Sequence, residues 1–162
     1  MNANNIWVTA NEIQIQTSPD IAGNFDIGFD DQIPESTRTE LKRFICWVEN
    51  NFNVPITLWV DFEYRHYLLD RNKKRAGYLF YWADFSSYPV FEKEDDIPAI
   101  RLPVRTEHYT IEEVLTSFIE AISCYFAWIS NIIVDEFTPD ENDVEEILQA
   151  YLSARSNDTV YV

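Results

Sequence analysis

A chain of 162 residues with 46% hydrophobic and 25% charged side chains is long and apolar enough to fold as one globular domain. Its formal net charge of −16 disfavours nucleic acids and anionic membranes as partners and favours a protein partner with a basic surface. No apolar run approaches a membrane span, the N-terminus lacks a signal-peptide pattern, and two cysteines make no disulfide framework, so we expect a single cytoplasmic domain over residues 1–162.

The first 35 residues are predicted to form an N-terminal strand and a loop. Residues 6–16 alternate between apolar and polar side chains, which indicates one short strand or two. Residues 17–35 contain Pro19, Gly23, Gly28 and Pro34 among scattered aspartates, and this composition favours a loop.

A helix is predicted to begin near Ser36 and is followed by strands. Its apolar side chains recur at helical spacing, as Leu41, Phe44, Ile45, Val48 and Phe52. Residues 56–63 and 76–83 are rich in β-branched and aromatic residues and flank a polar turn at 70–75, which predicts a hairpin. Residues 97–104 form a further short strand, whose prolines favour a sheet edge or a strand end.

Two capping boxes predict two helices in the C-terminal third. Thr110 and Glu113 form the first box, and the helix after it carries no charge from Ala121 onward to residue 134, so it should be buried nearly all round. Thr138 and Glu141 form the second box, with proline at the first helical position. That helix is expected to end near residue 154, before a loose tail at 155–162.

These elements predict an α+β fold, in which a small antiparallel or mixed sheet with a hairpin packs on about three helices. The helix–sheet–helix core is expected to span residues 36–154, with residues 1–35 as the N-terminal extension.

Motifs that would identify an enzyme are absent from the sequence. It contains no HExxH, CxxC, GxSxG or P-loop pattern. The two histidines, His66 and His108, have unrelated spacing, and we interpret them as ordinary surface or interface residues. Enzyme activity is therefore disfavoured.

A metal site has one set of candidate ligands. Glu120 and Cys124 lie four residues apart on one helical face, and Glu145 or Glu146 on the next helix could supply a third ligand. The simpler interpretation is that Cys124 is a small buried hydrophobe and Glu120 a solvated or paired acid. Cys46 has the same simple interpretation, so no cofactor is expected, and zinc would bind only if these ligands converge.

Residues 55–151 resemble the small bacterial zincin-like (SprT-like) metallopeptidase domains. In that family a hairpin and an edge strand precede a helix carrying HExxH, and the next helix supplies an acidic ligand. The passages that carry the resemblance are WVDFEYRHYLLDRNKKRAGYLFYW, IPAIRLPV and VLTSFIEAISCYFAWISN.

The resemblance implies a degenerate member of that family. It places Glu120 at the first zinc histidine, Ala121 at the catalytic glutamate and Cys124 at the second histidine, with Glu145 or Glu146 as the acidic ligand. The HExxH motif is thus replaced by Glu120-Ala121-Ile122-Ser123-Cys124, which implies loss of hydrolysis and of zinc, because alanine cannot act as general base for a zinc-bound water.

The favoured function is therefore that of a non-catalytic, acidic protein that binds a protein partner. Residues 106–154 contain no lysine or arginine but eleven acids, from Glu107 to Glu146. The candidate partner-binding acids are Glu112, Glu113, Asp140, Glu141 and Asp143.

Several alternatives remain open at this point. The acids could serve only solubility; the protein could be an immunity or antitoxin-type neutraliser or a nucleic-acid mimic; or it could be a metallohydrolase with atypical ligands. The basic stretch Arg65–Arg75 could also pair with the acidic helices of a second copy, which would give a homodimer.

Overall fold

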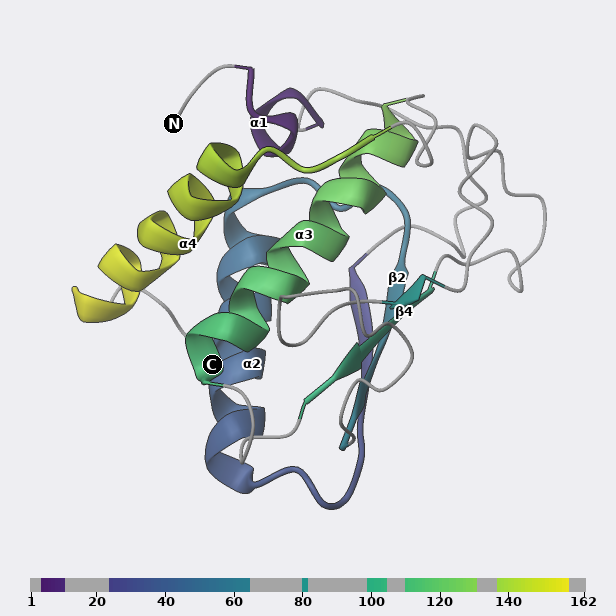
Figure 1. Ribbon diagram of the computed structural model, residues 1–162, viewed down its shortest axis with the longest axis vertical. Coiled ribbons are helices and arrows are strands. Elements are labelled where there is room, and N and C mark those ends of the chain that lie inside the picture. Colours follow the sequence, from purple (N-terminus) through teal and green to yellow (C-terminus); the bar gives the residue numbers. More distant parts are fainter. Residues whose placement is uncertain are drawn as a thin grey trace.

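The computed structural model describes residues 4–10, 24–64, 80–81, 99–104, 110–130 and 137–157 (Figure 1). The helices in these ranges are α1 (Ile6–Ala10), α2 (Glu35–Asn51), α3 (Ile111–Ile129) and α4 (Glu141–Ser156). The strands are β1 (Phe25–Phe29), β2 (Leu58–Glu63), β3 (Phe80–Tyr81) and β4 (Ala99–Pro103). The predicted α+β class is confirmed.

The four strands form one sheet in the order β1-β2-β4-β3. The first three strands in this order are parallel, and the two-residue β3 pairs antiparallel with β4. The predicted hairpin between residues 56–63 and 76–83 is therefore wrong, because β4 lies between β2 and β3. The zincin-like arrangement stays a prediction.

Strand β1 lies inside the segment that was predicted to be a loop. Its residues alternate between the two faces of the sheet, with Phe25 buried and Asp26 exposed. The parallel pairing with β2 supplies the hydrogen bonds that local composition does not reveal. Pro103 is the last residue of β4, which confirms the second of the two predicted positions, a strand end; β4 itself has a neighbouring strand on each side.

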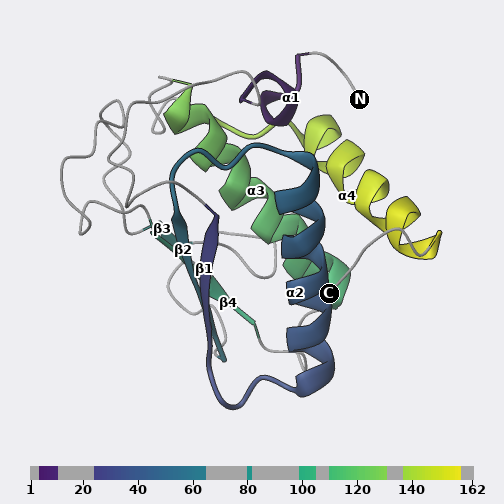
Figure 2. The ribbon, with the colours of Figure 1, turned by 180° about the vertical axis from the view of Figure 1, so that it is seen from behind.

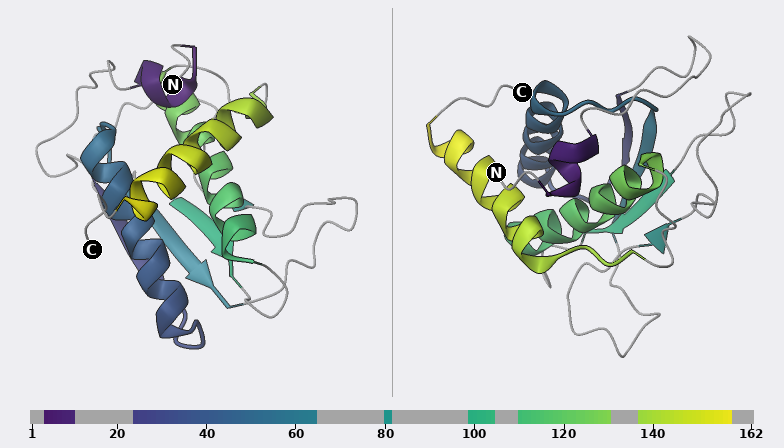
Figure 3. Two further views of the ribbon diagram at one scale, coloured as in Figure 1. Left: turned by 90° about the vertical axis from the view of Figure 1, so that its left-hand side faces the viewer. Right: turned by 90° about the horizontal axis from the view of Figure 1, so that it is seen from above.

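The helices form two layers on one face of the sheet. Helices α2 and α3 lie against it, and α4 lies outside them (Figures 2 and 3). One row of aromatic rings connects these layers. Phe118 of α3 packs on Phe62 of β2 at 5.3 Å and on Phe44 of α2 at 5.5 Å, between ring centroids. Phe44 in turn packs on Tyr151 of α4 at 5.0 Å.

Residues 6–10 are helical, so the predicted strand at 6–16 is wrong there, while residues 11–16 lie outside the described ranges. The side chain of Asn5 caps α1 by accepting a hydrogen bond from the Trp7 backbone at 3.0 Å. Trp7 is buried, with its ring edge-on to Phe52 at 5.1 Å and to Phe126 at 5.0 Å. This tertiary burial outweighs the weak local alternation.

Helix α3 confirms the first capping box and the prediction of burial. Thr110 and Glu113 exchange backbone–side-chain hydrogen bonds of 3.1 Å. From Val114 to the end of the helix, only Thr116 and Glu120 are not fully buried.

The second predicted capping box is wrong. Asp140, rather than Thr138, is the N-cap of α4, and its carboxylate accepts hydrogen bonds from the backbones of Asn142 and Asp143 at 2.9 and 3.1 Å. A carboxylate directly before the helix reaches these first free N–H groups, whereas Thr138 lies two residues too early. The helix also continues to Ser156, two residues into the predicted loose tail.

Candidate functional site

The predicted metal ligands lie on a tightly packed part of α3. Cys124 is a thiol outside any disulfide with 3% of its surface exposed, and Glu120, one turn before it, is half-buried. The described residues contain no group of three or more histidine, cysteine, aspartate or glutamate side chains that could hold a metal ion. His66 and His108 lie outside the described ranges, and Glu145 and Glu146 are on α4.

Ser123, in the same turn, has a structural role that the sequence did not reveal. Its hydroxyl accepts a hydrogen bond from the indole Nε1 of Trp7 at 2.8 Å and donates one to the Ile119 carbonyl at 2.7 Å. All three residues come from α1 and α3, and Trp7 and Ser123 are buried. The turn at Glu120–Cys124 thus holds the N-terminal helix in place.

An acidic groove runs between the first turns of α3 and α4. One hollow of about 380 Å³ is lined by Thr110, Glu112, Glu113, Thr116, Glu145, Leu148 and Gln149. An adjoining hollow of about 300 Å³ is lined by Thr116, Glu141, Asn142, Val144 and Glu145. Since the two hollows share Thr116 and Glu145, we treat them as one surface, the acidic groove.

Two of the carboxylates in the groove are held by neighbours on their own helix. Glu113 accepts a hydrogen bond from the Thr110 backbone at 3.1 Å, as part of the capping box. Glu145 accepts one from the Gln149 side chain at 2.8 Å. Glu112 is exposed and makes no hydrogen bond or ion pair within the described part of the chain. Its carboxylate is therefore available to a ligand.

The predicted partner-binding acids divide between two surfaces. Glu112, Glu113 and Glu141 line the acidic groove. Asp140 and Asp143 line a separate hollow of about 200 Å³ beside α1, together with Asn4, Ile6, Ser123, Phe137, Thr138 and Pro139. Glu145, predicted only as a metal ligand, belongs to the groove. The sequence signal that could have placed it there is its position one turn after Glu141 on α4.

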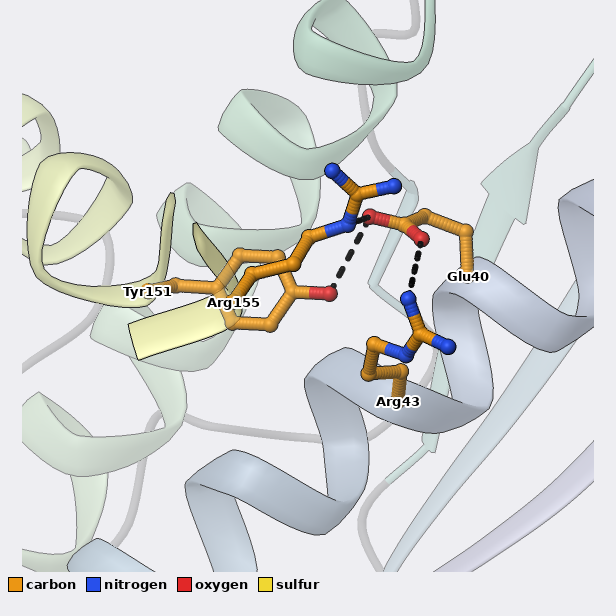
Figure 4. A network of polar contacts seen from close by, with 4 residues as sticks. All are labelled: Glu40, Arg43, Tyr151 and Arg155. Carbon is orange, nitrogen blue, oxygen red and sulfur yellow. Dashed lines mark hydrogen bonds and ion pairs between the residues drawn. The ribbon is translucent and has the colours of Figure 1, made fainter. Parts of the chain in front are cut away.

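Arg155, six residues after the groove residue Gln149, is engaged at the other end of α4. There Arg155 Nε lies 2.8 Å from Glu40 Oε1, the Tyr151 hydroxyl donates to the same oxygen at 3.1 Å, and Arg43 lies 3.8 Å from Glu40 Oε2 (Figure 4). Burial and the Glu40 carboxylate both raise the pKa of the Tyr151 phenol far above its ordinary value. This cluster fastens α4 to α2. The described residues that line the groove include no lysine or arginine.

Cys46 is half-buried on α2. Its sulfur is 3.6 Å from the side-chain amide of Asn50, one turn later. This contact within one helix fits the simple interpretation of Cys46, a small side chain without a ligand role.

The chain matches no protein-family model, no curated protein and no solved structure. No helix among the described residues combines the length and apolar character that crossing a membrane requires.

Proposed function

We propose that this protein acts by binding a basic protein partner through the acidic groove, without chemistry of its own. The observation that carries the proposal is the groove itself. Glu112 and Glu113 line one of its two adjoining hollows, Glu141 lines the other, and Glu145 lines both. No lysine or arginine occurs between residues 106 and 154 to neutralise them along the chain. A net charge of −16 adds long-range attraction for a basic partner and speeds its association.

The mixed lining of the groove favours a protein surface over a free cation. Leu148 and Val144 supply apolar contact beside the carboxylates, and Thr116 adds a hydroxyl. Protein interfaces combine such apolar contacts with a polar rim. Partners of this class include the basic toxins that immunity proteins neutralise and the basic proteins that nucleic-acid mimics bind. As the more specific form of the proposal, the protein neutralises such a basic partner by binding it.

We further propose that the scaffold descends from zincin-like metallopeptidases and has lost catalysis. In this proposal Glu120 and Cys124 occupy the places of the zinc histidines and Ala121 that of the catalytic glutamate. Burial of Cys124 and use of Ser123 to anchor Trp7 support a packed turn rather than an open metal site. Neither Cys46 nor Cys124 forms a disulfide, which is in keeping with the reducing cytoplasm, where we place the protein.

A pair of charge-matched variants tests the groove. Glu112→Gln with Glu145→Gln removes two groove charges, and Asp31→Asn with Glu35→Gln removes two exposed charges elsewhere. Wild type and both variants are used to capture proteins from a lysate of the source cells at low salt. We expect a basic partner that the groove variant binds roughly 2-fold to 30-fold more weakly, since each exposed pair contributes about 0.2–1 kcal/mol.

Three results would contradict this function. The first is equal loss of the partner in both variants, which would indicate net charge alone. The second is capture of no basic protein by the wild type at low salt. The third is stoichiometric zinc in protein purified without chelator, lost in Cys124→Ala, which would favour the metallohydrolase. Light scattering at low and high salt separates a homodimer from a different partner.

A further inference from the structure

The outer face of the sheet carries an exposed tryptophan between carboxylates. Helices α2, α3 and α4 lie on the other side of the sheet (Figure 1). On β2 the buried Leu58, Val60 and Phe62 alternate with outward-facing residues. Trp59 faces outward and is 48% exposed. Among the described residues, it is the largest apolar side chain that is exposed to this extent. Packing within the described part of the chain does not explain why an indole in the middle of the sheet is exposed.

The strand register places two carboxylates beside this indole. Asp26 of β1 is the direct partner of Trp59, and Gly28 is the partner of Asp61. A Cβ on Gly28 would lie 3.1 Å from Asp61 Oδ1, so the carboxylate of Asp61 leans over the glycine toward β1. Paired strands are about 4.8 Å apart and alternate residues about 7 Å apart, so both carboxylates are within reach of one group seated on the indole.

Asp26, Asp61 and Trp59 have no polar or aromatic side-chain partner among the described residues. Asp26 and Asp61 are exposed and take part in no ion pair or side-chain hydrogen bond there, and Trp59 contacts no other ring. By contrast, Phe29 at the end of β1 already has the Arg38 guanidinium 5.9 Å and the Lys42 ammonium 5.7 Å from its ring centroid. No described cation lies over the exposed indole of Trp59 on the same sheet, and Arg101 of β4 is the register partner of Asp61.

We propose that this face binds an arginine side chain of a basic protein partner. The planar guanidinium stacks on the Trp59 indole and donates hydrogen bonds to Asp26 and Asp61. Arginine suits the site better than lysine, because its flat, weakly hydrated head combines stacking with directed donors. The residues differ from those of the acidic groove, so this proposal and the proposed function can fail separately.

Charge complementarity decides against other occupants. Two copies placed face to face would bring Asp26 and Asp61 against their own equivalents, and like charges across an interface are unfavourable. A nucleic acid could stack a base on Trp59, but its phosphates would meet the same carboxylates.

The test uses the full chain and two capped peptides of equal charge, tetra-arginine and tetra-lysine. NMR titration follows the indole Nε1 resonance of Trp59, which is assigned by its absence in Trp59→Phe. We expect saturable movement of this resonance with the arginine peptide and about 2-fold to 5-fold tighter binding of arginine than of lysine. Trp59→Ala should remove that preference, and Asp26→Asn with Asp61→Asn should weaken both peptides.

The matched control is Asp31→Asn with Glu35→Gln, which removes the same charge from exposed positions elsewhere. This variant should keep the preference for arginine and the movement of the Trp59 resonance. Trp59 is exposed, so Trp59→Ala should fold, and circular dichroism checks this; Trp59→Phe, with a smaller aromatic face, should keep part of the preference.

The proposal is overturned if the Trp59 resonance does not respond to the arginine peptide, or if Asp31→Asn with Glu35→Gln loses binding as strongly as Asp26→Asn with Asp61→Asn. It is also overturned if Trp59→Ala keeps the preference for arginine. Two other results would assign this face to a different ligand. If the Trp59 resonance responds to a neutral oligosaccharide but not to the arginine peptide, the ligand is a sugar; if Trp59→Ala dissociates a dimer, it is a second copy of the chain.

Discussion

Single residues show how strongly tertiary contacts act on short stretches of this chain. Trp7 lies in a segment whose alternation predicts a strand, yet it belongs to a helix held by the buried hydroxyl of Ser123. An indole N–H buried beside Phe52 and Phe126 needs an acceptor, since an unpaired buried donor is unfavourable. Ser123 supplies that acceptor from the middle of α3.

We expect Ser123→Ala to lower the free energy of unfolding by about 1–3 kcal/mol, because it leaves the Trp7 indole N–H buried without a partner. Trp7→Phe should also be destabilising, through lost packing. The double variant should lose less than the sum of the two, since no orphaned donor remains. Urea unfolding of the four proteins measures the coupling. Strict additivity would show that the hydrogen bond contributes nothing.

Tyr125 connects α3 to the residue that precedes β2 by two positions. Its hydroxyl accepts a hydrogen bond from the Ile56 N–H at 3.1 Å and donates one to the Ile56 carbonyl. The residue is buried, and burial raises the pKa of its phenol far above the ordinary value of 10.0, although the backbone contact acts in the opposite direction.

This raised pKa predicts a loss of stability at alkaline pH. Below pH 10.0 the phenol is neutral in the folded and the unfolded chain, so its contribution is constant. Above that pH the unfolded chain releases the proton while the folded chain retains it, and the free energy of unfolding falls. Urea unfolding at several pH values should give a smaller alkaline decrease for Tyr125→Phe than for wild type. Equal decreases would contradict the prediction.

At the scale of elements, α4 shows the limit of motif matching. The four-residue spacing of the second capping box is present in the sequence, but the helix begins at Glu141 and takes Asp140 as its cap. Among threonine, proline and aspartate directly before the helix, the aspartate has the carboxylate that reaches the first two free N–H groups.

Alanine substitutions distinguish the two caps. Asp140→Ala should lower the free energy of unfolding by about 0.5–2 kcal/mol, because two backbone N–H groups lose their acceptor. Thr138→Ala, the matched control, should change it by less than about 0.5 kcal/mol. Thermal unfolding of both variants checks this. The reverse order would restore Thr138 as the functional cap.

Pairing of strands is the other feature that local pattern did not predict. The residues of β2 were identified correctly, but its partners were not: β1 and β4 flank it, both parallel. Parallel partners are joined by a crossover, here the helix α2 between β1 and β2, so the pairing depends on how the helix packs on the sheet.

At the scale of the whole molecule, net charge opposes folding. A charge of −16 on one domain repels itself more in the compact state than in the unfolded chain. In 0.1 M salt the Debye length is about 10 Å, so repulsion between exposed charges farther apart than this is largely screened.

We therefore expect sodium chloride to raise the melting temperature, by roughly 2–4 °C for each kcal/mol of repulsion screened. Glu112→Gln with Glu145→Gln should melt higher at low salt and respond less to salt, because two of the repelling charges are gone. A melting temperature independent of salt in both proteins would show that the acids are spaced too widely to interact.

Part of the candidate site was accessible from the sequence. Glu112, Glu113 and Glu141 were identified from the acidic composition alone, and they line the groove. Glu145 was assigned to a metal site instead, because its position in the groove depends on α4 packing beside α3. The outward position of Trp59 was not predicted, since a strand sequence does not show which face of the sheet the helices cover.

The sequence alone determined the α+β class, the start of α2, the cap and burial of α3 and the acidity of the C-terminal third, because these depend on spacing, capping and charge within a few turns of chain. Only the tertiary structure decided the parallel sheet, the helical conformation at Trp7 and the faces on which Glu145 and Trp59 lie. These depend on contacts between residues far apart in sequence, such as Trp7 with Ser123, which no local pattern contains.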